Sequence, residues 1–86
     1  MNMILMKVVT ECCAFFALSD DDAVDPDVAV AQLEQVAAIL KGLSPEDRGS
    51  FERYIRDLVR QERATGASRE RIAFLEALPE DLGISA

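Results

Sequence analysis

The sequence predicts an all-α domain, a small bundle of helices, and three features lead to this expectation. The 86 residues include only 4 Gly and 3 Pro, and Ala, Leu, Glu and Arg are frequent, which is a helical composition. A capping residue followed directly by proline, a strong helix start signal, occurs at Asp25-Pro26 and again at Ser44-Pro45. Between such signals, apolar residues recur at i, i+3 and i+4 spacing. The length fits one domain, 1–86.

The first predicted helix, residues 3–18, contains no Gly or Pro and carries only two charges, Lys7 and Glu11. On a helix, Lys7, Thr10, Glu11 and Ala14 fall in one narrow arc, and we expect Lys7 to pair with Glu11. The apolar residues, which occupy an arc wider than the roughly 100° of an amphipathic surface helix, are Ile4, Leu5, Val8, Val9, Cys12, Cys13, Phe15 and Phe16. We therefore expect this helix to be central, and to be covered on two or more sides by the rest of the chain or by a second copy.

An acidic loop, residues 19–25, separates this helix from a second one over 26–41, in which Asp25 is the expected N-cap and Gly42 the residue after the C-cap. One apolar face of the second helix is formed by Ala29, Leu33, Val36, Ala37 and Leu40. Val28 and Ile39 lie on a different side. This second helix is therefore also expected to be contacted on more than one side.

A third helix, 45–65, begins after the cap Ser44 and is expected to end at Gly66. Its inward face is formed by Phe51, Tyr54, Ile55, Leu58 and Val59. Because only three residues link it to the second helix, these two helices are expected to be antiparallel neighbours.

Ser68 caps a shorter fourth helix, 69–78, which turns Ile72, Leu75 and Leu78 inward, with Phe74 as a further candidate. Pro79 is expected to stop this helix. Residues 79–86 are then expected to be a frayed tail, with at most one further turn at its start.

The net charge of −7 argues against a general affinity for nucleic acid or for anionic lipid. Histidine is absent, and no Ser, Cys or Lys has a recognisable base partner, so we expect no enzyme, no metal and no cofactor. The adjacent Cys12 and Cys13 point about 100° apart on a helix, both into its apolar arc, and are poorly placed for a mutual disulfide. This favours a cytoplasmic location. The first helix matches neither a signal peptide nor a membrane span.

Two charged features are candidate binding sites. Arginines line the outer face of the third helix at Arg53, Arg56, Arg60 and Arg63. This row is either a solvated face with Glu52–Arg56 and Arg53–Asp57 pairs, a contact for the acidic loop within one chain or in a dimer, or a docking face for an external anion. The acidic loop contributes Asp20, Asp21 and Asp22. They lack the spacing of a calcium-binding loop, which favours solvation and capping.

Residues 63–73, RATGASRERIA, resemble the first half of a repressor-type helix-turn-helix, in which Gly-x-Ser opens a short helix that ends in an apolar-Ala pair. Residues 82–85, LGIS, are similar to the start of the recognition helix of that family, although Pro79 and Glu80 interrupt the pattern. The resemblance implies a nucleic-acid-binding regulator. That function requires Arg69 and Arg71 to be free of internal salt bridges.

The function predicted from these features is non-enzymatic: a small acidic helical protein that acts through protein–protein interaction, as a homodimer or with one protein partner. The residues expected to take part are Phe15, Phe16, Val28 and Ile39, together with the arginine row and the acidic triplet. Two alternatives stay open, an inhibitor of the immunity type that neutralises a basic partner, and the helix-turn-helix-like regulator using 63–73. We expect no membrane partner and no nucleic acid in the favoured case.

Overall fold

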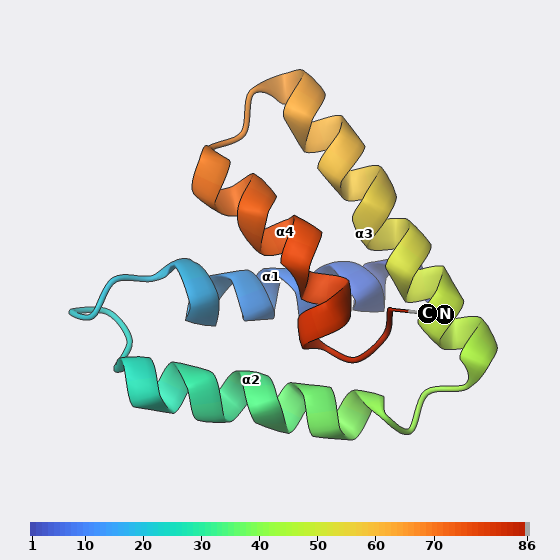
Figure 1. The fold of residues 1–86 in the computed structure, drawn as a ribbon, viewed down its shortest axis with the longest axis horizontal. Helices are drawn as coiled ribbons and strands as arrows, with labels where there is room; N and C mark the ends of the chain where they lie inside the picture. Colours follow the sequence, from blue (N-terminus) through green and yellow to red (C-terminus); the bar gives the residue numbers. More distant parts are fainter. Residues whose placement is uncertain (86) are drawn as a thin grey trace.

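A computed structural model describes residues 1–85, which form four α-helices and, within this range, no strand. The helices, coloured along the chain in Figure 1, are α1 (Met3–Leu18), α2 (Pro26–Leu40), α3 (Pro45–Thr65) and α4 (Arg69–Asp81). The predicted all-α class and the order of the helices are confirmed. The molecule is flattened, with extents of 38 × 32 × 21 Å.

The predicted start signals set the helix boundaries. The Asp25 carboxylate accepts hydrogen bonds from the amides of Asp27 and Val28, and Ser44 and Ser68 cap α3 and α4 in the same way. At the end of α3, Gly66 adopts a φ of 81°, a left-handed conformation that favours glycine. The sequence prediction missed one cap, Asn2, whose side chain accepts from the amides of Ile4 and Leu5.

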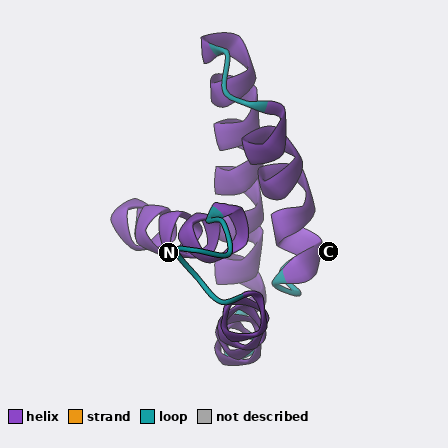
Figure 2. Cartoon of the chain, turned by 90° about the vertical axis from the view of Figure 1, so that its left-hand side faces the viewer, coloured by secondary structure: helices purple, strands orange, loops and turns teal. Residues whose placement is uncertain are grey.

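Two arrangements of helices build the core. α3 and α4 form an antiparallel hairpin, while α1 contacts each of the other three helices, in agreement with its predicted central place. Figure 2 shows α1 on one side of the layer made by α3 and α4, with α2 seen end-on below. α2 packs chiefly on α1 and not on α3, so the expected antiparallel α2–α3 pair is wrong. The reason is that the apolar face of α2, ending in the buried Leu40, joins the core under α1 and the end of α4.

The core has its largest fully buried side chains in the hairpin, at Phe51 and Ile55 of α3 and at Leu75 and Leu78 of α4. Met6 and Cys13 contribute from α1. Partly buried apolar residues that pack around this centre are Val9, Leu33, Val36, Ala37, Leu43, Tyr54 and Phe74. The predicted inward faces of α2, α3 and α4 are therefore confirmed.

The predicted end of the fourth helix is wrong, because Pro79 lies inside α4 and the helix continues to Asp81. The residues beyond it are not a frayed tail: Leu82 and Ile84 are only 2% and 3% exposed. Gly83 takes a φ of 70°, and the amides of Ile84 and Ser85 donate to the Pro79 carbonyl at 2.9 and 3.1 Å. Burial of two aliphatic side chains outweighs the one helical hydrogen bond that the proline lacks.

α1 is rotated relative to the prediction, so that only part of its apolar arc, including Cys13 and Val9, faces the core. Its buried residues are Met6, Thr10, Cys13 and Ala14, which include two members of the arc expected to be polar and exposed. The buried Thr10 hydroxyl finds its hydrogen-bond partner within the same helix, because it donates to the Met6 carbonyl at 2.8 Å. The small side chains at positions 10, 13 and 14 allow the neighbouring helices to approach α1 closely. As a consequence, most of the larger apolar side chains of α1 point outward.

Candidate interaction surface

The outward side of α1 is a continuous apolar surface. Its members, here called the α1 face, are Ile4, Leu5, Val8, Cys12, Phe15 and Leu18, all of them exposed. Ile4 is 73% exposed and Phe15 57%. From Ile4 to Leu18 the face is about 21 Å long at 1.5 Å per residue. A monomer of this size rarely leaves so long a stripe of large apolar side chains uncovered.

The spacing along the α1 face suits a second helix. Leu5, Val8, Cys12 and Phe15 follow intervals of three, four and three residues, which is the heptad pattern of helices that pack side by side. The Phe15 ring also makes an edge contact with that of Phe16, at 5.6 Å between centroids. Phe16 itself is partly buried. Of the two predicted contact residues on this helix, Phe15 therefore belongs to the exposed α1 face, whereas Phe16 is partly buried and packs against the Phe15 ring.

The predicted contact residues of α2 do not form a comparable surface. Val28 is 55% and Ile39 66% exposed, but they stand at opposite ends of the helix. Gln32 and Gln35, both exposed, occupy the same line of the helix between them. The apolar surface of α2 is consequently interrupted in its middle, whereas Leu5, Val8, Cys12 and Phe15 of α1 follow one another along the helix surface with no polar residue between them.

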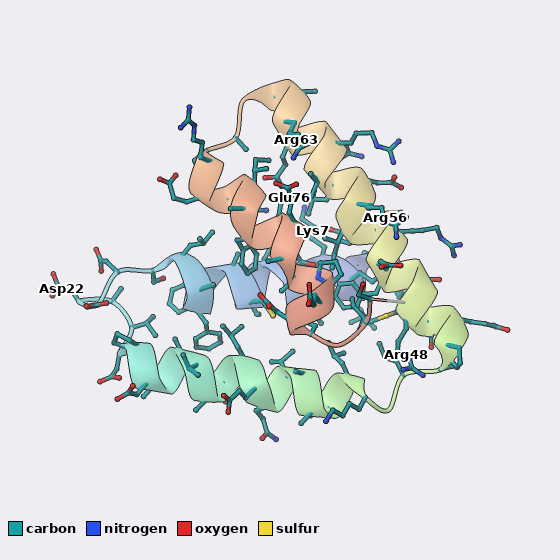
Figure 3. The ribbon with its side chains drawn as sticks, in the orientation of Figure 1. Lys7, Asp22, Arg48, Arg56, Arg63 and Glu76 are labelled. Atoms are coloured by element: carbon teal, nitrogen blue, oxygen red, sulfur yellow. The ribbon has the colours of Figure 1, made fainter. Side chains whose placement is uncertain are left out.

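The arginine row is largely compensated by acids of the same chain. The guanidinium of Arg56 lies 3.0 Å from Glu52, that of Arg60 lies 2.9 Å from Asp57, and that of Arg63 lies 2.8 Å from Glu76. Figure 3 shows Arg63 and Glu76 directed toward one another between α3 and α4.

The expected Arg53–Asp57 pair is wrong, because Asp57 binds Arg60 one turn further along. Arg53 has no ion pair among the described residues. It is the one member of the arginine row left available to an outside acid.

Arg53 stands on the rim of a groove between the first turns of α1 and the middle of α3, with a volume of about 620 Å³. Its lining includes Met3, Ile4 and Leu58 as apolar residues and Lys7 as a second cation. Lys7 does not pair with Glu11 as expected, and forms no ion pair within residues 1–85. The groove thus combines an apolar floor with two uncompensated positive charges.

The acidic triplet is exposed in the loop that follows α1, and Figure 3 places Asp22 at its outer tip. Asp20 accepts a hydrogen bond from the amide of Ala23 and so shapes the turn. In the part of the chain that the structure describes, neither Asp21 nor Asp22 has a salt bridge, and the loop does not fold against the arginine row.

Glu11 binds Arg71 in place of Lys7. The Arg71 guanidinium donates to Glu11 at 2.7 Å and to Glu62 at 2.6 and 2.9 Å, which ties α4 to α1 and to α3. The hydrogen bonds from Glu62 and then from Glu11 raise the pKa of Arg71 above its ordinary value, against the lowering effect of burial. Glu11, an acid beside the α1 face, thus shares one guanidinium with Glu62, and the three groups together carry one net negative charge.

The helix-turn-helix resemblance does not extend to the structure. Of the two arginines that this function requires to be free, Arg71 is held in ion pairs with Glu11 and Glu62, whereas Arg69 has no ion pair among residues 1–85. Residues 82–85 form the buried closing turn after α4 and not the start of a recognition helix. The turn at Gly66–Ser68 is the connection of an antiparallel hairpin.

The two cysteines have different environments. Cys13 is buried, and this burial, followed by the neighbouring Cys12, raises the pKa of its thiol from 9.0 to about 11. Cys12 is exposed in the middle of the α1 face, so the expectation that both point inward is wrong for this residue. Within residues 1–85, no group of three His, Cys, Asp or Glu side chains is placed to hold a metal ion.

Comparison with protein-family models, curated proteins and solved structures finds no match for this chain. None of the four described helices is both long and apolar enough to cross a bilayer. The function therefore has to be inferred from the surface itself. Sequence reasoning named only Phe15 of the α1 face as a contact residue; the heptad spacing of positions 5, 8, 12 and 15 was the signal for the others.

Proposed function

We propose that this protein is a non-enzymatic interaction protein that associates with a second copy of itself through the α1 face. The observation that carries the proposal is the exposed apolar stripe on the side of α1 opposite its buried residues. A helix that buries Thr10 and Ala14 while Ile4 and Phe15 stay exposed pays the unfavourable free energy of hydrating apolar side chains. A second surface that covers these side chains removes that free-energy cost.

A second copy is a suitable cover because the stripe is self-complementary. Two α1 faces present aliphatic and aromatic side chains at the same heptad intervals, so each can pack between those of the other. The acid beside the stripe, Glu11, is hydrogen-bonded to Arg71 of α4, which holds its carboxylate in place within its own chain.

The energy available is consistent with reversible association. Full burial of a large apolar side chain contributes about 1.5–3 kcal/mol, so each half-exposed member of the α1 face contributes about 1 kcal/mol per copy. The five large members, which are all but Cys12, give about 10 kcal/mol over the two copies, against an association cost of about 4–15 kcal/mol. We therefore expect a dimer that dissociates on dilution.

Sedimentation equilibrium at micromolar to millimolar concentrations tests the proposal. The expected result is a monomer–dimer equilibrium that Val8→Asp abolishes, since this change buries two charges in the contact. Helical circular dichroism of the variant serves as the folding control, because Val8 is exposed in the monomer. A clean monomer at high micromolar concentration would overturn the proposal. Recovery of one basic protein from native lysate by such a monomer would instead support the immunity-type inhibitor.

A further inference from the structure

We infer that the two copies associate with their α1 helices antiparallel, and that the acidic tip of each copy, Asp21 and Asp22, lies over the cationic groove of the other, between Lys7 and Arg53. This inference rests on the proposed self-association and adds its orientation and its second contact. The apolar α1 face supplies the main contact, and the two acidic tips occupy the two grooves at its ends.

The positions of these groups along α1 favour that orientation. The groove begins beside Met3 and Ile4, at the start of the helix, whereas the acidic tip follows its last residue, Leu18. In an antiparallel pair, Leu18 of one copy lies beside the first turn of the other, so the tip that follows it reaches the groove. The two helix dipoles also oppose each other in this arrangement.

The parallel orientation is electrostatically unfavourable for the same residues. It would place the acidic loops of both copies side by side, with Asp20, Asp21 and Asp22 facing their own equivalents. Like charges in such proximity cost free energy, and the cost would be added to the repulsion of two chains that each carry a net charge of −7.

The charges on both sides of the proposed contact have no partner of opposite charge among the described residues of one chain. Lys7 and Arg53 form no salt bridge among residues 1–85, and neither do Asp21 and Asp22. The acid that lines the groove, Asp57, is bound to Arg60 at 2.9 Å and leaves Arg53 available. Two cations in each groove match the two acids of each tip.

Charge reversal within a single chain tests the pairing. The tip variant carries Asp21→Lys and Asp22→Lys, the groove variant carries Lys7→Glu and Arg53→Glu, and the third variant combines all four changes. Asp20 is left unchanged because it shapes the loop through its bond to the Ala23 amide.

At low salt, each two-site variant is expected to dimerise about tenfold more weakly than the wild type, and the four-site variant to recover wild-type affinity. These differences should shrink at 1 M salt, where the screening length is about 3 Å. The tip variant is informative in another way. Replacing two aspartates by two lysines changes its net charge by +4, from −7 to −3, so the reduced non-specific repulsion by itself would strengthen its association.

Arg69→Glu is the matched control, since this exposed cation has no described ion pair and lies at the start of α4, away from the groove. It is expected to change the affinity by less than twofold. Unchanged or tighter dimers of the tip and groove variants, or no recovery in the four-site variant, would overturn the inference while leaving self-association intact.

A distance measurement determines the orientation independently. A nitroxide is placed on Ser19→Cys in a Cys12→Ala background, which keeps the α1 face apolar and whose dimerisation is first compared with that of the wild type by sedimentation equilibrium; Cys13 is buried and escapes labelling. In an antiparallel pair, position 19 lies beside position 4 of the other copy, so the two labels are separated by more than about 20 Å along the helices. A parallel pair would bring them to about 10 Å and would overturn the orientation. Absence of any dimer would overturn the proposed function together with this inference.

Discussion

Truncation of Phe15 gives the sharpest test of the α1 face. Its ring is 57% exposed in the monomer, and full burial of a phenylalanine side chain contributes up to about 3 kcal/mol. Covering the exposed part in a dimer is therefore worth about 1.5 kcal/mol per copy. Because a two-fold contact uses the residue twice, Phe15→Ala is expected to weaken the dimer by about 3 kcal/mol, or about 100-fold in Kd.

The assay is sedimentation equilibrium of the wild type and Phe15→Ala over the same concentrations, with Ile39→Ala as the comparison. Ile39 is 66% exposed but lies on α2, outside the α1 face, so its truncation should leave Kd within about twofold. Thermal unfolding of dilute monomer shows whether folding is affected; loss of the edge contact with Phe16 should cost no more than about 1.5 kcal/mol. Equal Kd values for Phe15→Ala and the wild type would refute the reasoning.

Three further predictions concern the cysteines and the closing turn. A thiol reagent should modify Cys12 and not Cys13 in the folded protein, and the rate at Cys12 should fall as protein concentration rises, which mass spectrometry after digestion can follow. Because the pKa of Cys13 is raised in the folded protein, its thiol ionises at lower pH in the unfolded chain than in the folded one. The free energy of unfolding should therefore fall between pH 9 and about 11. Urea unfolding should show that Cys13→Ala lessens this fall by about 2 kcal/mol. Ile84→Ala should lower the free energy of unfolding by about 2–4 kcal/mol, whereas a frayed tail would give no change.

Most of the fold could be predicted because its signals are local. A cap followed by proline, as at Asp25-Pro26, determines where a helix begins almost regardless of the rest of the chain. The inward faces of α3 and α4 could also be predicted from the sequence, because their apolar residues lie on one side of each helix and their charged residues on the other.

The end of α4 was mispredicted because local and tertiary preferences conflict there. Pro79 is a helix breaker by its covalent structure, but the residues after it carry Leu82 and Ile84 into the core. Their burial depends on a surface formed by α1, α2 and α3, which no local pattern reports. The same applies to Glu11, whose partner Arg71 lies 60 residues away in the sequence.

The rotation of α1 is the difference with functional consequences. Hydrophobicity alone placed Thr10 and Ala14 outside, but packing selects side chains by size as well as by polarity, and three helices meet α1. A stripe of small residues lets them approach, with Thr10 bonded to its own helix. The large side chains are then left on the opposite side, where none of residues 1–85 covers them. A helix that meets its own domain with its small residues and the solvent with Ile4 and Phe15 leaves a large apolar surface exposed, and we propose that a second copy covers it.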